Sequence, residues 1–183
     1  MSKDQLYIFD TTLRDGAQTQ GVDFSMEDKE KIALALDNLG VDYIEGGWPG
    51  ANPSDTEFFQ KSLNLKNSTF TAFGMTKKAG RSAENDPGLS AILNSNTNAV
   101  CVVGKSWDFH VDVALGISNE ENLENIKETT KHFVKSNKEF MFDAEHFFDG
   151  YKANPKYALA CVCLLYTSPS PRDLSTSRMP SSA

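Results

Sequence analysis

Charged residues capable of chemistry cluster near the N-terminus of this 183-residue chain, within residues 9–18. The apolar run at 6–9 predicts a buried parallel strand, and Arg14 and Asp15 follow just past its carboxyl end. Ligands bind at that end of strands in α/β folds. There, an aspartate can hold a divalent cation and an arginine can hold an oxyanion, with Gly16 supplying a tight turn. A surface ion pair is the alternative interpretation.

The rest of the chain alternates between strand and helix signals. Apolar runs predict further strands at 41–45, 69–74, 99–104 and 140–142. Helix starts are marked by capping residues or by a cap followed by proline, at Ser25, Asn52-Pro53, Asp86-Pro87, Ser118 and Asn154-Pro155. Five strand–helix units predict a parallel sheet with helical crossovers. These units fit either a doubly wound domain, which the length favours, or part of an eight-unit barrel.

Polar residues recur directly after these strands, as expected at a catalytic mouth. They are Arg14, Asp15, Gln18, Glu45, Thr76, Lys105, His110, Asp143, Glu145 and His146. The residues alone leave open whether Glu45 and Asp143 cap helices or pair with Lys105. The two histidines are interpreted as structural rather than metal-binding.

Composition excludes several classes of protein. The net charge of −7 and a pI of about 4.9 argue against a non-specific nucleic-acid binder. The sequence shows neither a signal peptide nor an apolar run long enough to span a membrane. The three cysteines have no disulfide or zinc spacing, so we expect a reducing, cytoplasmic setting.

Residues 10–16 together with Gln18 resemble the signature that opens the catalytic barrel of the 2-isopropylmalate, homocitrate and citramalate synthases. These enzymes are metal-dependent and condense an acyl-CoA with a keto acid. The resemblance implies a TIM-type (β/α)8 barrel of which this chain holds about the first five units. Residues 45–53, 104–108 and 143–152 resemble the citramalate synthase branch, which joins acetyl-CoA and pyruvate in isoleucine biosynthesis.

The resemblance also implies roles for individual residues. Asp15 matches the position that binds the divalent metal (Mg²⁺, Mn²⁺ or Zn²⁺), and Arg14 and Glu145 match catalytic positions. The implied substrate-binding residues are Arg14, Gln18, Glu45, Thr76, Lys105 and Asp143.

The family places its remaining metal ligands and a dimerisation domain beyond the part that this chain resembles. We therefore expect a homodimer for the full-length form and no activity for this chain alone. Alternatives are a 2-isopropylmalate or homocitrate synthase, a hydroxymethylglutaryl-CoA lyase-like enzyme, or a non-catalytic α/β binding module.

We predict that residues 1–162 form the N-terminal part of the barrel. Residues 163–183 are expected to be a disordered, non-native tail, because most of this segment is Ser, Thr and Pro without an apolar period. Residues 163–173 also resemble a translated sequencing adapter.

Overall fold

The computed structural model describes residues 5–167, in which five parallel strands form one sheet in the order β1-β2-β3-β4-β5. The strands are β1 (Phe9–Asp10), β2 (Tyr43–Glu45), β3 (Thr69–Met75), β4 (Ala99–Lys105) and β5 (Glu139–Glu145). The longer helices are α1 (Met26–Leu39), α2 (Pro53–Phe58), α3 (Pro87–Leu93), α5 (Asn119–Lys135), α6 (Phe147–Ala153) and α7 (Pro155–Thr167). Shorter turns are η1 (Gly16–Gln18), η2 (Ala83–Asn85), α4 (Asp108–His110) and η3 (Val111–Leu115).

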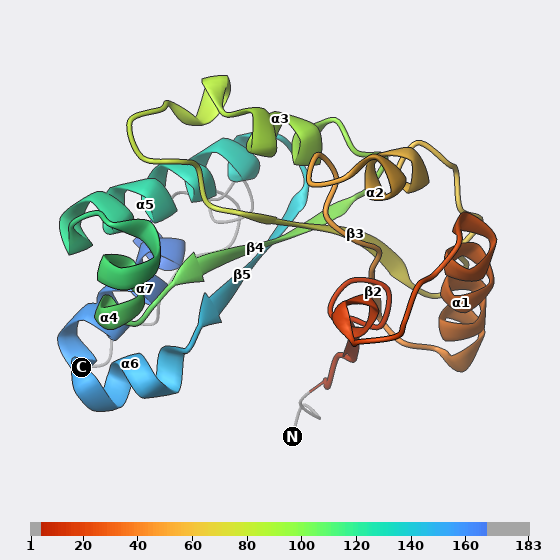
Figure 1. Ribbon diagram of the computed structural model, residues 1–183, viewed down its shortest axis with the longest axis horizontal. Coiled ribbons are helices and arrows are strands. Elements are labelled where there is room, and N and C mark those ends of the chain that lie inside the picture. Colours follow the sequence, from red (N-terminus) through yellow and green to blue (C-terminus); the bar gives the residue numbers. More distant parts are fainter. Residues whose placement is uncertain (1–4, 168–183) are drawn as a thin grey trace, which may run out of the picture.

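The helices cover one face of the sheet, as Figure 1 shows for α2, α3 and α5. Ala72, Val100 and Val102 on β3 and β4 pack against Ile92 of α3 and Phe133 of α5. Ile44 of β2 likewise packs toward α1 and α2. A doubly wound sheet would carry helices on both faces and would reverse its strand order. The partial barrel is therefore confirmed, and the open sheet favoured by length is excluded.

The opposite face is concave, which one contact demonstrates. The hydroxyl of Tyr43 on β2 donates to Glu139 on β5, with 2.9 Å between the oxygens. Two strands lie between them, so a flat sheet would separate the backbones by about 14 Å. The sheet must curve for these side chains to meet, as in a barrel wall. Burial, followed by the Glu139 hydrogen bond, raises the pKa of Tyr43 to about 12.

The structure confirms the helix caps predicted from the sequence at the starts of α1, α2 and α3. Ser25 and Asp28 form a reciprocal capping box at the start of α1, and Gly40 ends that helix with a φ of 86°. The side chains of Asn52 and Asp86 cap α2 and α3, each followed by proline. No helix within residues 5–167 has the length and apolarity required to cross a lipid bilayer.

Two boundaries differ from the sequence-based expectation. The predicted buried strand at 6–9 is wrong: β1 begins at Phe9, and Leu6, Tyr7 and Ile8 are exposed, because β1 pairs only with β2 among the described strands. Helix α7 continues past residue 162 to Thr167, because its partly buried Leu164 packs on the cluster around Ile126. The rest of the expected tail, 168–183, lies outside the described residues.

Asp37 holds together the connection between α1 and β3. Its carboxylate, 3 % exposed, accepts hydrogen bonds from the backbone N–H groups of Lys66, Asn67 and Ser68 at 2.8–3.1 Å. Burial opposes its ionisation, but these N–H groups outweigh burial and lower the pKa of Asp37.

Replacing Asp37 by Asn is expected to lower the free energy of unfolding by about 2 kcal/mol at pH 7, because an amide offers one acceptor oxygen where a charged carboxylate offers two. The difference in free energy of unfolding between wild type and variant should shrink as the pH falls through the lowered pKa of Asp37. At that pH the wild-type carboxylate becomes protonated, and the stability that its charge provides is lost. Urea unfolding measures it, with the exposed Asp23→Asn as control. An equal loss in both variants contradicts this role.

Candidate active site

The loop after β1 is a compact turn in which the neighbouring side chains of Leu13 and Arg14 point in different directions. The carbonyl of Thr11 accepts the N–H groups of Arg14, Asp15 and Gly16 at 2.9–3.1 Å. Leu13, 1 % exposed, is packed into the core. The turn does not require Gly16 as predicted: its φ is not positive, and a Cβ there would meet nothing closer than 3.7 Å. The shared Thr11 carbonyl makes the turn instead.

Arg14 is held by three neighbours on the concave side of the sheet. Its Nε donates to Oε2 of Glu45 at 2.7 Å, and its guanidinium carbon lies 4.0 Å from the ring centroid of Phe73. A terminal nitrogen, Nη1, lies 3.3 Å from a carboxylate oxygen of Asp15. Cation–π and ion-pair contacts together fix the plane of the guanidinium. This arrangement presents Arg14 as a fixed fork rather than a mobile surface charge.

Glu45 is the most buried charged group of the site. It is 1 % exposed, and its second oxygen, Oε1, has no hydrogen-bond partner among the described residues. Burial raises its pKa, Asp143 and Asp15 add to the increase, and Arg14 opposes it. Of the alternatives left open by the sequence, Glu45 neither caps a helix nor pairs with Lys105. It pairs with Arg14.

The second half of the site lies at the carboxyl ends of β4 and β5. The ammonium of Lys105 forms an ion pair and hydrogen bond with Oε2 of Glu145. Lys105 and Glu145 are opposite each other in the register of these strands, as are Val103 and Asp143. The pKa of Asp143 is raised by partial burial, then by Glu145 and Asp15.

The charges of both halves act on one further residue. The buried Cys101 on β4 has its pKa raised to about 12, first by burial and then by Glu45 and Asp143, with Arg14 acting in the opposite direction. The two halves therefore share one electrostatic environment on the concave face.

Two predicted substrate-binding residues lie apart from this cluster. Gln18 is exposed on η1, and no hydrogen bond within residues 5–167 joins its side chain to the cluster. Thr76 follows β3 and lines a neighbouring cavity. The rings of His110 and His146 meet edge to face, with their centroids 4.5 Å apart. Nδ1 of His146 also lies within hydrogen-bond distance of the Asp149 carboxylate, at 3.2 Å. These contacts fit the interpretation of both as structural histidines.

The residues present do not by themselves form a metal centre. No group of three His, Cys, Asp or Glu side chains within residues 5–167 is arranged to hold an ion. Asp15, whose side chain is 65 % exposed, offers one hard oxygen donor at the mouth of the concave face. A divalent ion needs several such donors.

Neither Phe73 nor Trp48 was among the residues predicted to form the site. Phe73 lies under Arg14, and Trp48 meets the Phe73 ring edge-on with centroids 5.5 Å apart. The available signal was the alternation of β3, in which Thr71, Phe73 and Met75 share the face opposite to the helices.

A curved parallel sheet with helices on its outer face and paired charges at the strand ends defines an α/β-barrel protein whose charged side chains gather at the carboxyl edge of the sheet. A family model described as HMGL-like matches residues 5–163, and the chain belongs to the HMGL-like family.

Two curated relatives illustrate where the chain lies within this family. It is 52 % identical over 158 residues to the (R)-citramalate synthase of Aquifex aeolicus, an alignment that covers 85 % of this chain and 30 % of that protein. It is 35 % identical over 146 residues to 2-isopropylmalate synthase 1 of Caldanaerobacter subterraneus subsp. tengcongensis, covering 79 % of this chain and 36 % of that relative.

The solved structures agree on the fold. The hydroxymethylglutaryl-CoA (HMG-CoA) lyase of Bacillus subtilis superimposes with a TM-score of 0.60 at 22 % identity, covering 76 % of this chain and 46 % of the lyase. This chain spans about 30 % of the length of the citramalate synthases that it matches.

Replacing Glu45 by Gln should flatten the pH dependence of stability. The folded-state pKa of Glu45 is raised, so the native protein binds its proton more tightly than the unfolded chain does. The free energy of unfolding therefore falls as the pH rises from the pKa of Glu45 in the unfolded chain, about 4.3, through its raised pKa in the folded protein. Urea unfolding between pH 4 and 8 should show a smaller decline in Glu45→Gln than in wild type or in the exposed control Glu57→Gln. Parallel curves would refute the assignment.

Proposed function

We propose that this chain is the N-terminal barrel segment of a citramalate synthase-type acyltransferase. The enzyme would join the methyl carbon of acetyl-CoA to the keto carbon of pyruvate and hydrolyse the thioester, giving citramalate and CoA. The observation that carries the proposal is the 52 % identity to an (R)-citramalate synthase, against 35 % to a 2-isopropylmalate synthase.

Arg14 has the geometry for the keto acid. Glu45 and Phe73 hold its guanidinium in place, so its remaining N–H groups present a fixed pair of donors to a carboxylate or to an oxygen that gains negative charge. Donors that are oriented before the reaction stabilise developing charge without reorganising. We assign Arg14 to the pyruvate and to the oxyanion formed during attack.

Glu145 is suited to moving protons at the opposite side of the same space. Its side chain is one-third exposed, and Oε2 is paired with the ammonium of Lys105. This pairing keeps the carboxylate oriented and leaves Oε1 for a substrate proton, directly or through a water molecule. Asp143 and Lys105 complete the charged wall around it.

Asp15 is proposed to supply one ligand to a divalent cation, either Mg²⁺, Mn²⁺ or Zn²⁺. Its exposed carboxylate is an appropriate hard donor, although it requires ligands beyond those in residues 5–167. A cation bound there would polarise the keto group of the acceptor. We further propose that the enzyme is a cytoplasmic homodimer serving isoleucine biosynthesis, with Gln18 and Thr76 contributing to substrate binding.

We also propose that residues 163–183 do not belong to the native domain. The support is that the family match ends at residue 163, although helix α7 itself continues to Thr167.

The function can be tested in a chimera in which residues 5–163 replace the matched segment of the Aquifex aeolicus (R)-citramalate synthase. With saturating Mn²⁺ or Mg²⁺, the chimera should release CoA thiol from acetyl-CoA and pyruvate. Arg14→Lys should lower kcat/KM by about 100-fold, because a point charge cannot replace a planar fork. Asp15→Asn should abolish metal-dependent turnover.

Both substitutions are expected to leave the fold intact, which circular dichroism and thermal melting would verify. The exposed Asp23→Asn serves as the matched control and should keep wild-type turnover. Activity of Asp15→Asn close to that of the control at saturating metal would remove Asp15 from the site.

The same chimera tests the acceptor. It should use pyruvate with a higher kcat/KM than 2-oxoisovalerate or 2-oxoglutarate, because its segments after β2, β4 and β5 resemble those of the citramalate synthases. The measurement is the initial rate of thiol release with each keto acid. Faster use of 2-oxoisovalerate would assign the segment to the isopropylmalate branch instead.

A further inference from the structure

A buried ion pair lies on the helix side of the sheet, outside the charged cluster of the candidate site. The ammonium of Lys29 on α1 is ion-paired and hydrogen-bonded to Oδ1 of Asp55 on α2, and the two residues are only 5 % and 9 % exposed. Charges are costly to bury, and an apolar pair of similar volume is often at least as stabilising. The stability of the domain therefore does not explain why two charges are placed here.

The second oxygen of Asp55 binds the loop that follows β2. Oδ2 accepts the backbone N–H of Trp48 at 2.9 Å and the side-chain amide of Asn52 at 3.1 Å. The side-chain oxygen of Asn52 accepts the backbone N–H of Asp55 at 2.7 Å, which sets the carboxylate at the start of α2. Both oxygens of Asp55 are thus occupied, one by the Lys29 ammonium and the other by the Trp48 N–H.

The same loop approaches Asp55 so closely that it requires a glycine. Gly47 has a φ of 143°, and a Cβ built there would lie 2.7 Å from the carboxylate carbon of Asp55. A larger residue at position 47 would push the carboxylate away from the loop. The backbone at 46–48 and the Asp55 carboxylate are therefore packed together without room for adjustment.

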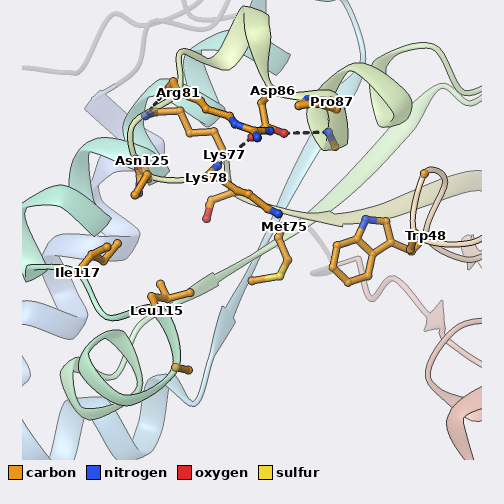
Figure 2. Close-up of a pocket in the computed structure, with 16 residues that line it drawn as sticks. Trp48, Met75, Lys77, Lys78, Arg81, Asp86, Pro87, Leu115, Ile117 and Asn125 are labelled. Atoms are coloured by element: carbon orange, nitrogen blue, oxygen red, sulfur yellow. Dashed lines mark hydrogen bonds between the residues drawn. The ribbon is translucent and has the colours of Figure 1, made fainter.

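This loop also positions the ring that supports Arg14. The carbonyl of Gly47 accepts the N–H of Phe73 at 3.0 Å, and the Trp48 ring meets the Phe73 ring edge-on, with centroids 5.5 Å apart. Figure 2 shows the Trp48 ring at the carboxyl end of β3, on the wall of a cavity of about 820 Å³. Phe73 is thus held through its backbone and its ring by the segment that Asp55 binds, and the guanidinium carbon of Arg14 lies 4.0 Å from the ring centroid.

We propose that Lys29 and Asp55 are positioning residues for Arg14, an inference that rests on the proposed function. From the helix side of the sheet they hold the loop at 46–48, this loop holds Phe73, and Phe73 keeps the guanidinium oriented toward the acceptor. The carboxylate is needed because Asp55 accepts from an ammonium and from a backbone N–H at the same time. Asparagine has one acceptor oxygen, so its NH₂ group would face one of these two donors.

The test compares variants of the chimera. Asp55→Asn should lower kcat/KM for pyruvate by about tenfold and leave the KM for acetyl-CoA within about twofold, because only the orientation of Arg14 changes. Adding Asp55→Asn to Arg14→Lys should cost no more than about a further twofold, because the guanidinium through which Asp55 acts is then already absent. Losses that multiply in the double variant would overturn the proposal.

A second variant separates positioning from stability. Lys29→Met/Asp55→Leu replaces the ion pair by apolar side chains and is expected to melt at or above the temperature of Asp55→Asn. Its kcat/KM for pyruvate should still be about tenfold below that of the parent chimera, because no carboxylate receives the Trp48 N–H. Wild-type kinetics in this variant would show that the pair is merely structural. The matched control is Glu30→Gln, which breaks the exposed ion pair of Glu30 with Lys61 and should leave the kinetic constants unchanged.

Fluorescence of the 183-residue chain gives a readout that requires no turnover. The chain has two tryptophans, so Trp48 is the remaining fluorophore in a Trp107→Phe background. Asp55→Asn should shift its emission to longer wavelength as the Trp48 ring leaves Phe73 and meets water, whereas Glu30→Gln should not; an unshifted emission overturns the proposal. An active chimera whose pyruvate kinetics are unaffected by Asp55→Asn removes the positioning role and leaves the function standing. An inactive parent chimera with the emission shift removes the function and supports the hold of Asp55 on the loop.

Discussion

The buried pairing of Arg14 with Glu45 is the interaction on which the candidate site depends. A carboxylate that is 1 % exposed requires a cation within hydrogen-bond distance, and Arg14 provides it at 2.7 Å. Arg14 in turn can reach Glu45 only because the turn after β1 buries Leu13 and leaves Arg14 beside Phe73. The ion pair thereby joins the turn after β1 to β2 on the concave face, and the cation–π contact with Phe73 adds β3.

The balance of charge at the site favours a bound cation. The two cations Arg14 and Lys105 face four carboxylates, those of Asp15, Glu45, Asp143 and Glu145. The raised pKa values of Glu45 and Asp143 express this excess of negative charge together with burial. A divalent ion at Asp15 would relieve the repulsion and reverse part of these shifts. This excess of carboxylates supports the proposal that Asp15 contributes to a metal site.

Features set by local sequence were predictable, and features set by distant contacts were not. Capping by Ser25 and the end of α1 at Gly40 follow from neighbouring residues, so the sequence predicted both. The pairing of Glu45 with Arg14 joins residues 31 positions apart and depends on the curvature of the sheet, so helix capping and Lys105 remained open as alternatives. The strand at 6–9 was misread because an apolar run predicts burial only where another element covers it, and Leu6 is 84 % exposed.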